Sequence, residues 1–179
     1  MKTLLLVFML VISAACFSAP ISNWEKQKTS HAQIRKGAYI NQHYGLVVQQ
    51  VPGIRMYVDK PPAPNHGALF IIAEKRMMDV FVSAEDPDTD SAAQVVDQLL
   101  AVPGTRLIGK REPARLGNVP ADQVAYLTAE GEPRRSVVYF DKTAQLSYTA
   151  TLYSDVAHFA EDASVFAALL QRITIAHRD

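Results

Sequence analysis

The alternation of polar and apolar residues at positions 145–153 constrains the fold of this chain more than any other feature. Apolar and hydroxyl-bearing side chains take turns along it: Leu146, Tyr148, Ala150 and Leu152 alternate with Ser147, Thr149 and Thr151. This period of two predicts a strand with one buried face and one more polar face. A tight loop at residues 141–144 precedes it, so residues 134–153 are predicted to form a hairpin.

An amphipathic helix is predicted directly after this hairpin. Apolar residues recur there at spacings of three and four: Val156, Phe159, Ala160, Ala163, Phe166, Ala167 and Leu170. A helix with this pattern has one apolar face, which must be buried against a sheet. Residues 134–175 therefore predict two strands and a helix, around which the rest of the chain is organised.

Further strands are predicted upstream of this segment. Residues 39–52 form either a pair of strands or one bent strand, with Gly45 at the turn or bulge. The other predicted strands are residues 68–73, 77–83, 105–111 and 121–129. The strand at 77–83 is apolar on both faces apart from Asp79, which is typical of a sheet covered on both sides. We therefore expect helices on each face.

Turn and cap residues separate these strands. The acidic run at residues 86–90 and Ser91 suit the start of a helix over residues 91–102, which Pro103 and Gly104 would end. Three prolines in residues 60–66 predict a loop. Because most strands follow one another through short connections, the sequence predicts an α+β fold, with a twisted, mainly antiparallel sheet of about six strands flanked by helices.

Residues 1–19 are predicted to be an export signal. Lys2 precedes an apolar run at residues 4–12, which is far shorter than the roughly 20 residues that a membrane-spanning helix needs. Small residues then lead to Cys16 in a pattern that resembles a bacterial lipobox, although Ser13 stands where leucine is usual. Two outcomes follow: a soluble periplasmic or secreted protein, or an envelope protein anchored by a lipid on Cys16.

The rest of the chain is predicted to be a tether at residues 20–36, with a helical turn around 31–36, and a single α+β domain at 37–179. Cys16 is the only cysteine, so the mature domain has no disulfide. The 18 basic and 18 acidic residues balance, which argues against a nucleic-acid partner, because phosphate backbones are bound by a clustered excess of lysine and arginine.

Two patterns of acidic and histidine residues were considered for metal binding and catalysis. Asp86, Asp88 and Asp90 have the alternate spacing of a calcium loop, with Asp97 at its twelfth position, but Ser91 stands where such a loop needs glycine. A solvated helix start explains the run, and no metal is expected.

A helical turn would bring Ser154, Asp155 and His158 together, as a nucleophilic site requires. No G-x-S-x-G elbow accompanies them, and helix capping by Asp155 or Ser154 accounts for these residues. The glycines form no phosphate-binding motif. We therefore expect no catalytic residues and no cofactor.

Two groups of residues are candidates for binding. Lys110, Arg111 and Arg115 form a small basic cluster, and Arg134 and Arg135 would join it if their strands are neighbours; such a cluster is either solvated surface or a docking site for an acidic partner or lipid headgroups. The aromatic residues form the second group: Trp24, Tyr39 and Tyr44. They either line a groove between the tether and the sheet or close the edge of the core.

Four short features also suggest a family. They are the Leu-Gly-Asn-Val-Pro-Ala turn at residues 116–121 before a strand that ends in Tyr126, the strand at 137–141, Leu146-Ser-Tyr148 running into the helix, and the final Ile-Thr-Ile at 173–175. In these features residues 45–175 resemble the PsbP-like and DcrB-like group of small exported or lumenal α+β proteins. The resemblance implies a twisted antiparallel sheet flanked by helices and a non-enzymatic accessory role.

The sequence thus predicts an exported, non-enzymatic accessory or binding protein of the bacterial envelope. It would recognise a protein or small-molecule partner through an exposed strand edge or a groove between sheet and tether, and would touch the membrane only if Cys16 is lipidated. Two alternatives stay open. One is a small-ligand carrier with a pocket lined by tyrosine and phenylalanine, and the other is a hydrolase of unfamiliar type that uses aspartate and histidine side chains.

Overall fold

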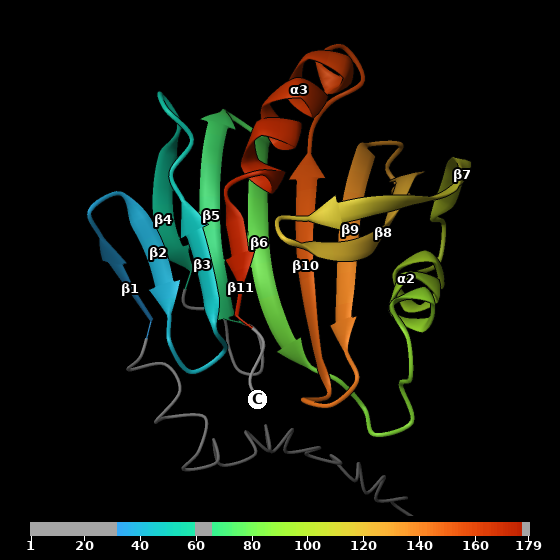
Figure 1. The fold of residues 1–179 in the computed structure, drawn as a ribbon. Coiled ribbons are helices and arrows are strands. Elements are labelled where there is room, and N and C mark those ends of the chain that lie inside the picture. The colour runs from blue at the N-terminus through green and yellow to red at the C-terminus, as the bar shows by residue number, and fades with distance from the viewer. Residues whose placement is uncertain (1–31, 60–65, 177–179) are drawn as a thin grey trace, which may run out of the picture.

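The structure, a computed structural model, describes residues 32–59 and 66–176, which form eleven strands and two helices in two antiparallel sheets (Figure 1). The smaller sheet has the strand order β1 (Ala32–Arg35), β2 (Ala38–Asn41), β3 (Leu46–Gln49) and β11 (Ile173–Ile175). The larger sheet has the order β4 (Arg55–Asp59), β5 (His66–Ala73), β6 (Arg76–Ala84), β10 (Leu146–Tyr153), β9 (Pro133–Asp141), β8 (Val119–Leu127) and β7 (Arg106–Leu116). The helices are α2 (Ala92–Leu100) and α3 (Phe159–Leu170).

Strand β10 lies in the middle of the larger sheet, between β6 and β9. Its pairing places Tyr148 opposite Tyr139 on β9 and Val82 on β6. The loop before it is closed by the Asp141 carboxylate, which accepts hydrogen bonds from the backbone amides of Thr143 and Ala144 at 3.0 and 3.1 Å. The predicted hairpin is therefore confirmed, and it is the centre of the sheet.

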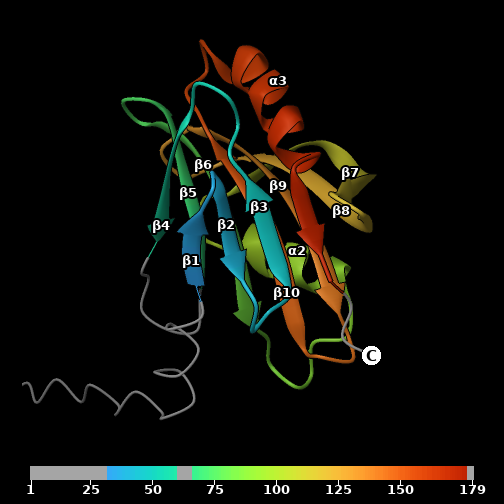
Figure 2. The ribbon, with the colours of Figure 1, turned by 60° about the vertical axis from the view of Figure 1, so that its left-hand side comes forward.

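The main core lies between the two sheets, where the smaller sheet and α3 cover one face of the larger sheet, which we call the inner face (Figure 2). The larger sheet contributes alternate residues that are fully buried: Ala68, Phe70, Met78, Val80, Val82, Val137, Ala150 and Leu152. Tyr39, Leu46 and Val48 of the smaller sheet and Phe166 and Leu169 of α3 pack against them. The apolar positions predicted for β10 fill this core. Of those predicted for the helix, Phe166 is buried, whereas Val156 is 77% exposed and precedes α3; Leu169, which was not among them, is fully buried.

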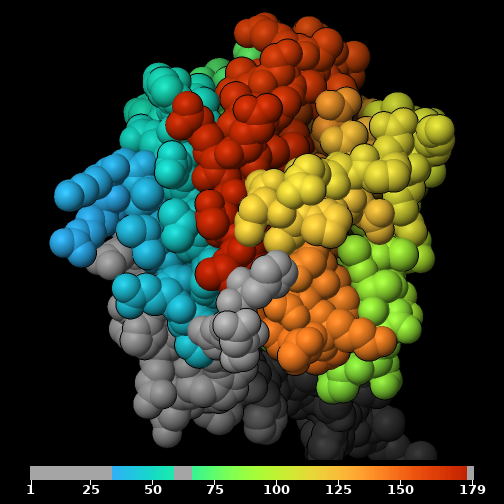
Figure 3. Space-filling model, viewed as in Figure 1, coloured from blue at the N-terminus to red at the C-terminus, as the bar shows by residue number. Residues whose placement is uncertain are grey.

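The hairpin of β7 and β8 curls over the inner face toward β11 (Figures 1 and 3). It bends where the pairing register shifts between Ile108 and Glu112, beside Gly109 at a φ of +75°. A β-bulge of this kind increases the local twist and turns the strand. Beyond the bend Leu116 and Val119 enter the core, with exposed fractions of 0 and 1%.

The turn at the tip of this hairpin closes the free edge of β11. Gly117 has a φ of +59°, and a Cβ atom there would lie 1.9 Å from the carbonyl oxygen of Ile173. The next side chain, Asn118, donates to the carbonyl oxygen of Ile175 and accepts from its backbone amide, both at 2.9 Å. A side-chain amide thus takes the place of a neighbouring strand, which explains the Gly-Asn pair in the turn noted in the sequence.

Helix α2 packs on the opposite face of the larger sheet, which we call the outer face, and covers β8 and β9. Val95 and Val96 of the helix form a second apolar cluster with Val124, Val138 and Phe140. Ser91 caps the helix by accepting a hydrogen bond from the backbone amide of Gln94 at 3.4 Å, as the sequence predicted. The two helices therefore lie on opposite faces of the larger sheet.

The α+β, antiparallel class is confirmed, but the expected number of about six strands is wrong, because the described residues form eleven strands in two sheets. The helical turn expected at residues 31–36 is also wrong, since Ala32–Arg35 is strand β1, which pairs with β2. Residues 32–36 of the tether predicted at 20–36 therefore belong to the smaller sheet, and its other residues lie outside the described ones. Lys36 and Gly37 connect the two strands with φ values of +50° and +73°, the conformation that a two-residue hairpin turn requires.

Candidate binding groove beside helix α2

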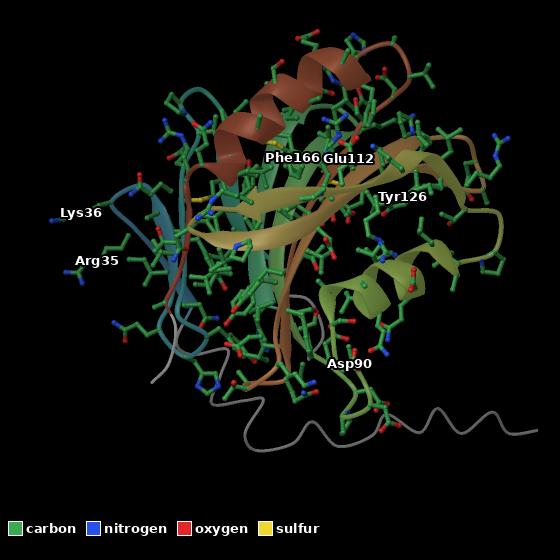
Figure 4. All side chains as sticks on the ribbon, turned by 45° about the vertical axis from the view of Figure 1, so that its right-hand side comes forward. Arg35, Lys36, Asp90, Glu112, Tyr126 and Phe166 are labelled. Carbon is green, nitrogen blue, oxygen red and sulfur yellow. The ribbon has the colours of Figure 1, made fainter. Side chains whose placement is uncertain are left out.

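A groove opens on the outer face where α2 leaves β6 and β10 partly uncovered. We call it the α2 groove; its volume is about 330 Å³. The outer rows of β6 and β10 form its floor, from Asp79 to Glu85 and from Ser147 to Tyr153, and Val95, Leu99 and Val102 form its wall. Figure 4 shows Tyr126 on the α2 side of the sheet and Phe166 on the side of α3.

The floor of the groove is polar although much of it is buried. Ser147 and Thr151 have exposed fractions of 3 and 5%. The hydroxyl groups of Thr151 and Ser136 lie 3.1 Å apart, and Tyr126 approaches Ser136 at 3.5 Å. The sequence had predicted a more polar face for this strand, and the structure places that face in the groove.

Asp79, which is buried, and Tyr153, which is half-buried, form a pair in the floor. Burial raises the pKa of Tyr153 far above its ordinary value near 10, and Asp79, which accepts a hydrogen bond from the phenol, raises it further. The guanidinium of Arg134, centred 4.8 Å from the Tyr153 ring, acts in the opposite direction. The phenol therefore stays protonated and holds the Asp79 side chain in place.

The charged groups of the groove are all acidic among the described residues that line it. They are Asp79, with an exposed fraction of 6%, and Glu85, which accepts a hydrogen bond from Ser147. The apolar lining comes from Phe81 and from the α2 side chains. The groove thus combines carboxyl groups, hydroxyl groups and an apolar wall.

The structure separates the basic residues that the sequence grouped together. Arg134 and Arg135 lie on opposite faces of β9, because successive side chains of a strand alternate. Arg134 reaches Tyr153 on the outer face and pairs with Glu132 at 2.5 Å, whereas Arg135 lies 5.3 Å from the Phe159 ring, at the start of α3. The two residues therefore do not form one patch.

The other basic candidates lie on β7. Arg111 pairs with Asp97 of α2 at 2.5 Å, which ties the helix to the edge strand. Arg115 donates to the backbone oxygen of Asn118 at 2.5 Å, within the turn of the hairpin. Lys110 is exposed beside the bulge. Two of these three cations thus have internal partners.

Tyr39 and Tyr44 do not line a surface groove, because both side chains are in the core, with exposed fractions of 0 and 2%. Of the two interpretations given above, closing the core is the one that the structure supports for these residues. Trp24, Cys16 and the predicted export signal lie outside the described residues. None of the helices in the described part of the chain is long and apolar enough to cross a membrane.

The residues considered for catalysis are not arranged as a relay. Ser154 donates to Asp162 at 2.5 Å, while His158 Nδ1 lies 2.8 Å from Asp155. The serine is also buried, with an exposed fraction of 2%. Asp155 accepts from the backbone amide of His158, which is itself the N-cap residue of α3, so neither Asp155 nor Ser154 caps the helix as predicted.

The acidic run before α2 serves the local turn. The Asp86 carboxylate accepts from the amide of Asp88 at 3.0 Å, and Asp97 is engaged by Arg111. Within residues 32–59 and 66–176, no three His, Cys, Asp or Glu side chains are grouped so that they could hold a metal ion.

Sequence reasoning missed the α2 groove, although two of its signals were visible. Asp79 interrupts an otherwise apolar strand, and serine and threonine occupy positions 147, 149 and 151 of β10. A carboxyl group in a buried strand has to find polar partners. Placing the groove also requires the position of α2, which the sequence of the strands does not encode.

This architecture resembles that of PsbP-like proteins. A comparison with solved structures matches the chain to the solution structure of cyanobacterial PsbP (CyanoP) from Synechocystis sp. PCC 6803, with a TM-score of 0.57 and 14% sequence identity. The match covers 78% of this chain and 91% of that chain. It confirms the PsbP-like resemblance at the level of the fold. No protein-family model and no curated protein matches the sequence.

Proposed function

We propose that this protein is an exported, non-catalytic accessory protein of the cell envelope that recognises a partner through the α2 groove. The observation that carries the proposal is the polar floor of the groove. Hydroxyl and carboxyl groups on the central strands β6 and β10 face an open space of about 330 Å³ beside an apolar wall. Surfaces that combine convergent polar groups with apolar walls are typical of binding sites.

The edge strand β7 is a less favourable docking site than the groove. It carries Lys110, Arg111 and Pro113 near its bulge. Charged side chains, proline and bulges on an edge oppose the addition of another strand. The groove is therefore better supported than recognition through the edge at β7, although this groove is bounded by α2 instead of the tether.

Two further observations support the non-catalytic and exported parts of the proposal. Ser154 and His158 engage different carboxylates, so these two residues do not form the pair of nucleophile and base that the hydrolase alternative needs. The leader sequence at residues 1–19 has the pattern of an export signal. The PsbP-like fold is compatible with an accessory role.

Site-specific photo-crosslinking in the native host tests the proposal. A photoreactive residue at Thr149, on the floor of the groove, is expected to give a crosslinked product in the envelope fraction. The same residue at Val156, which is 77% exposed in the segment before α3, is the control. No product from Thr149, or equal products from both positions, would contradict recognition through the groove.

The intact mass of the protein in that fraction tests its processing. A chain cleaved near Cys16 supports export, and an added acyl mass on Cys16 identifies the lipid-anchored form. A full-length chain that starts at Met1 and stays in the cytoplasmic fraction would contradict export.

A further inference from the structure

The two carboxyl groups of the α2 groove, Asp79 and Glu85, can each be placed by a partner residue on β10. Glu85 is held by the Ser147 hydroxyl, and Asp79 lies directly opposite Thr151 in the pairing of β6 with β10. Ser147 and Thr151 are four residues apart on the same face of β10, so these two positions on the floor of the groove are separated by about 13 Å along the strand.

An extended peptide presents side chains with the same spacing. Residues i, i+2 and i+4 of a strand share a face, and i and i+4 are again about 13 Å apart. Two cationic side chains at i and i+4 would therefore face Glu85 and Asp79 together. The residue between them would face the middle of the groove, where Phe81 and Leu99 provide apolar surface.

The charge of the groove favours such a ligand. No lysine, arginine or histidine is among the described residues that line it. The nearest cation described above, Arg134, lies over the Tyr153 ring and is already paired with Glu132. Opposite charge on the two sides of an interface steers association and fixes register.

Resting on the proposed function, we propose that the α2 groove binds an extended, basic segment of a partner protein, with lysine or arginine side chains four positions apart on Asp79 and Glu85. The aliphatic stems of these side chains pack against the wall of α2, as long cationic side chains do on apolar surfaces. Val102, which follows α2 and is 57% exposed, provides apolar surface at the rim for the rest of the segment.

The test is a fluorescence anisotropy titration of the full mature chain with short labelled peptides. One peptide carries two lysines four residues apart between small apolar residues. A second has the same composition with the lysines three residues apart, so that they point to opposite faces of a strand. The first peptide is expected to bind at least about tenfold more tightly than the second, a difference of about 1.4 kcal/mol.

Variants of the groove are expected to remove this preference. Glu85→Gln and Asp79→Asn should each weaken binding of the first peptide about tenfold. Glu112→Gln, which changes an exposed carboxylate outside the lining, is the matched control and should bind as the wild type does (Figure 4). Because Asp79 is buried, a loss of binding in Asp79→Asn does not separate recognition from folding, so Glu85→Gln alone is sufficient to decide.

Three results would overturn the inference. They are equal affinity for the two lysine spacings, unchanged affinity in Glu85→Gln, and displacement of the peptide by an equal concentration of spermidine, which would indicate a site for small cations. If Thr149 still gives its crosslinked product in the Asp79→Asn, Glu85→Gln double variant, the proposed function stands and this inference fails.

Discussion

Arg76 on β6 and Asp162 on α3 hold each other through two hydrogen bonds, from Nε to Oδ2 at 2.8 Å and from Nη2 to Oδ1 at 2.5 Å. The Asp162 side chain is fully buried, and Ser154, just after β10, donates to its second oxygen at 2.5 Å. Burial alone would raise the pKa of Asp162, but the hydrogen bonds from Arg76 and Ser154 hold it below its ordinary value. This cluster attaches α3 to the two central strands of the sheet.

Neutralising Asp162 should destabilise the protein. Asp162→Asn leaves the mostly buried guanidinium of Arg76 without its charged partner, and breaking a buried pair in this way costs about 3 kcal/mol. Urea denaturation followed by circular dichroism measures the change. Glu161→Gln is the control, because that carboxylate is 72% exposed and lies 3.7 Å from Arg76. Equal stability of the two variants would show that the buried pair contributes nothing specific.

Low pH should decrease the stability of the protein through Asp162. Because the pKa of Asp162 is lower in the folded chain than in the unfolded chain, the unfolded state takes up a proton first as the pH falls. The stabilisation from Asp162 is therefore present above about pH 4 and is lost as the pH falls through the folded-state value. The free energy of unfolding, measured by denaturation at several values between about pH 6 and pH 2, should fall less steeply with decreasing pH for Asp162→Asn than for the wild type. Parallel curves would contradict this assignment.

Gly117 should tolerate no side chain. Gly117→Ala places a Cβ atom 1.9 Å from the Ile173 carbonyl oxygen at a φ of +59°. Gly109→Ala is a matched control, since Gly109 also has a positive φ, +75°, but has no atom within 4 Å of an added Cβ. The free energy of unfolding of the control should fall by about 1 kcal/mol from backbone strain alone. That of Gly117→Ala should fall considerably more. Thermal unfolding compares the two variants, and similar losses would mean that the turn moves away from β11.

The hydroxyl of Tyr148 should connect the two sheets. It donates to the backbone oxygen of Tyr44 at 2.7 Å, and both residues are buried. Tyr148→Phe leaves that carbonyl oxygen without this donor, so a loss of about 1 to 2 kcal/mol is expected. Tyr57→Phe, on a ring that is 46% exposed, should change the free energy of unfolding little. A wild-type stability for Tyr148→Phe would indicate that water replaces the hydroxyl.

The parts of the fold that were predicted correctly are encoded by local patterns. The period of two in β10 and the apolar repeat of α3 each lie within one segment of sequence, so the hairpin and the helix were recognised. The β2–β3 hairpin was also expected, as one of the two options for residues 39–52 with Gly45 at the turn, and the structure confirms it. The pairing of β3 with β11 was not expected, because it joins distant residues. Leu46 of β3 pairs with Ile175 of β11, which is only three residues long, and β1 is a strand only because β2 pairs with it.

The candidate site also depends on contacts that local sequence patterns do not encode. The polar row of β10 and the interruption at Asp79 were visible in the sequence, but the groove exists because α2 packs over β8 and β9 and leaves β6 and β10 open. Arg134 and Arg135, in contrast, were grouped by their nearness in sequence, although strand alternation places such neighbours on opposite faces.

The pairing of β3 with β11 also determines when the chain can fold. The first hairpin described, β1 with β2, belongs to a sheet whose last strand is Ile173–Ile175, and the smaller sheet forms one side of the main core. Residues up to Ile175 must therefore have been synthesised before that core can close. Contacts between the two ends of a chain form slowly, because a long loop has to be closed first. Until then one side of the main core stays open, because Leu46 and Val48 of β3 lack their partners on β11.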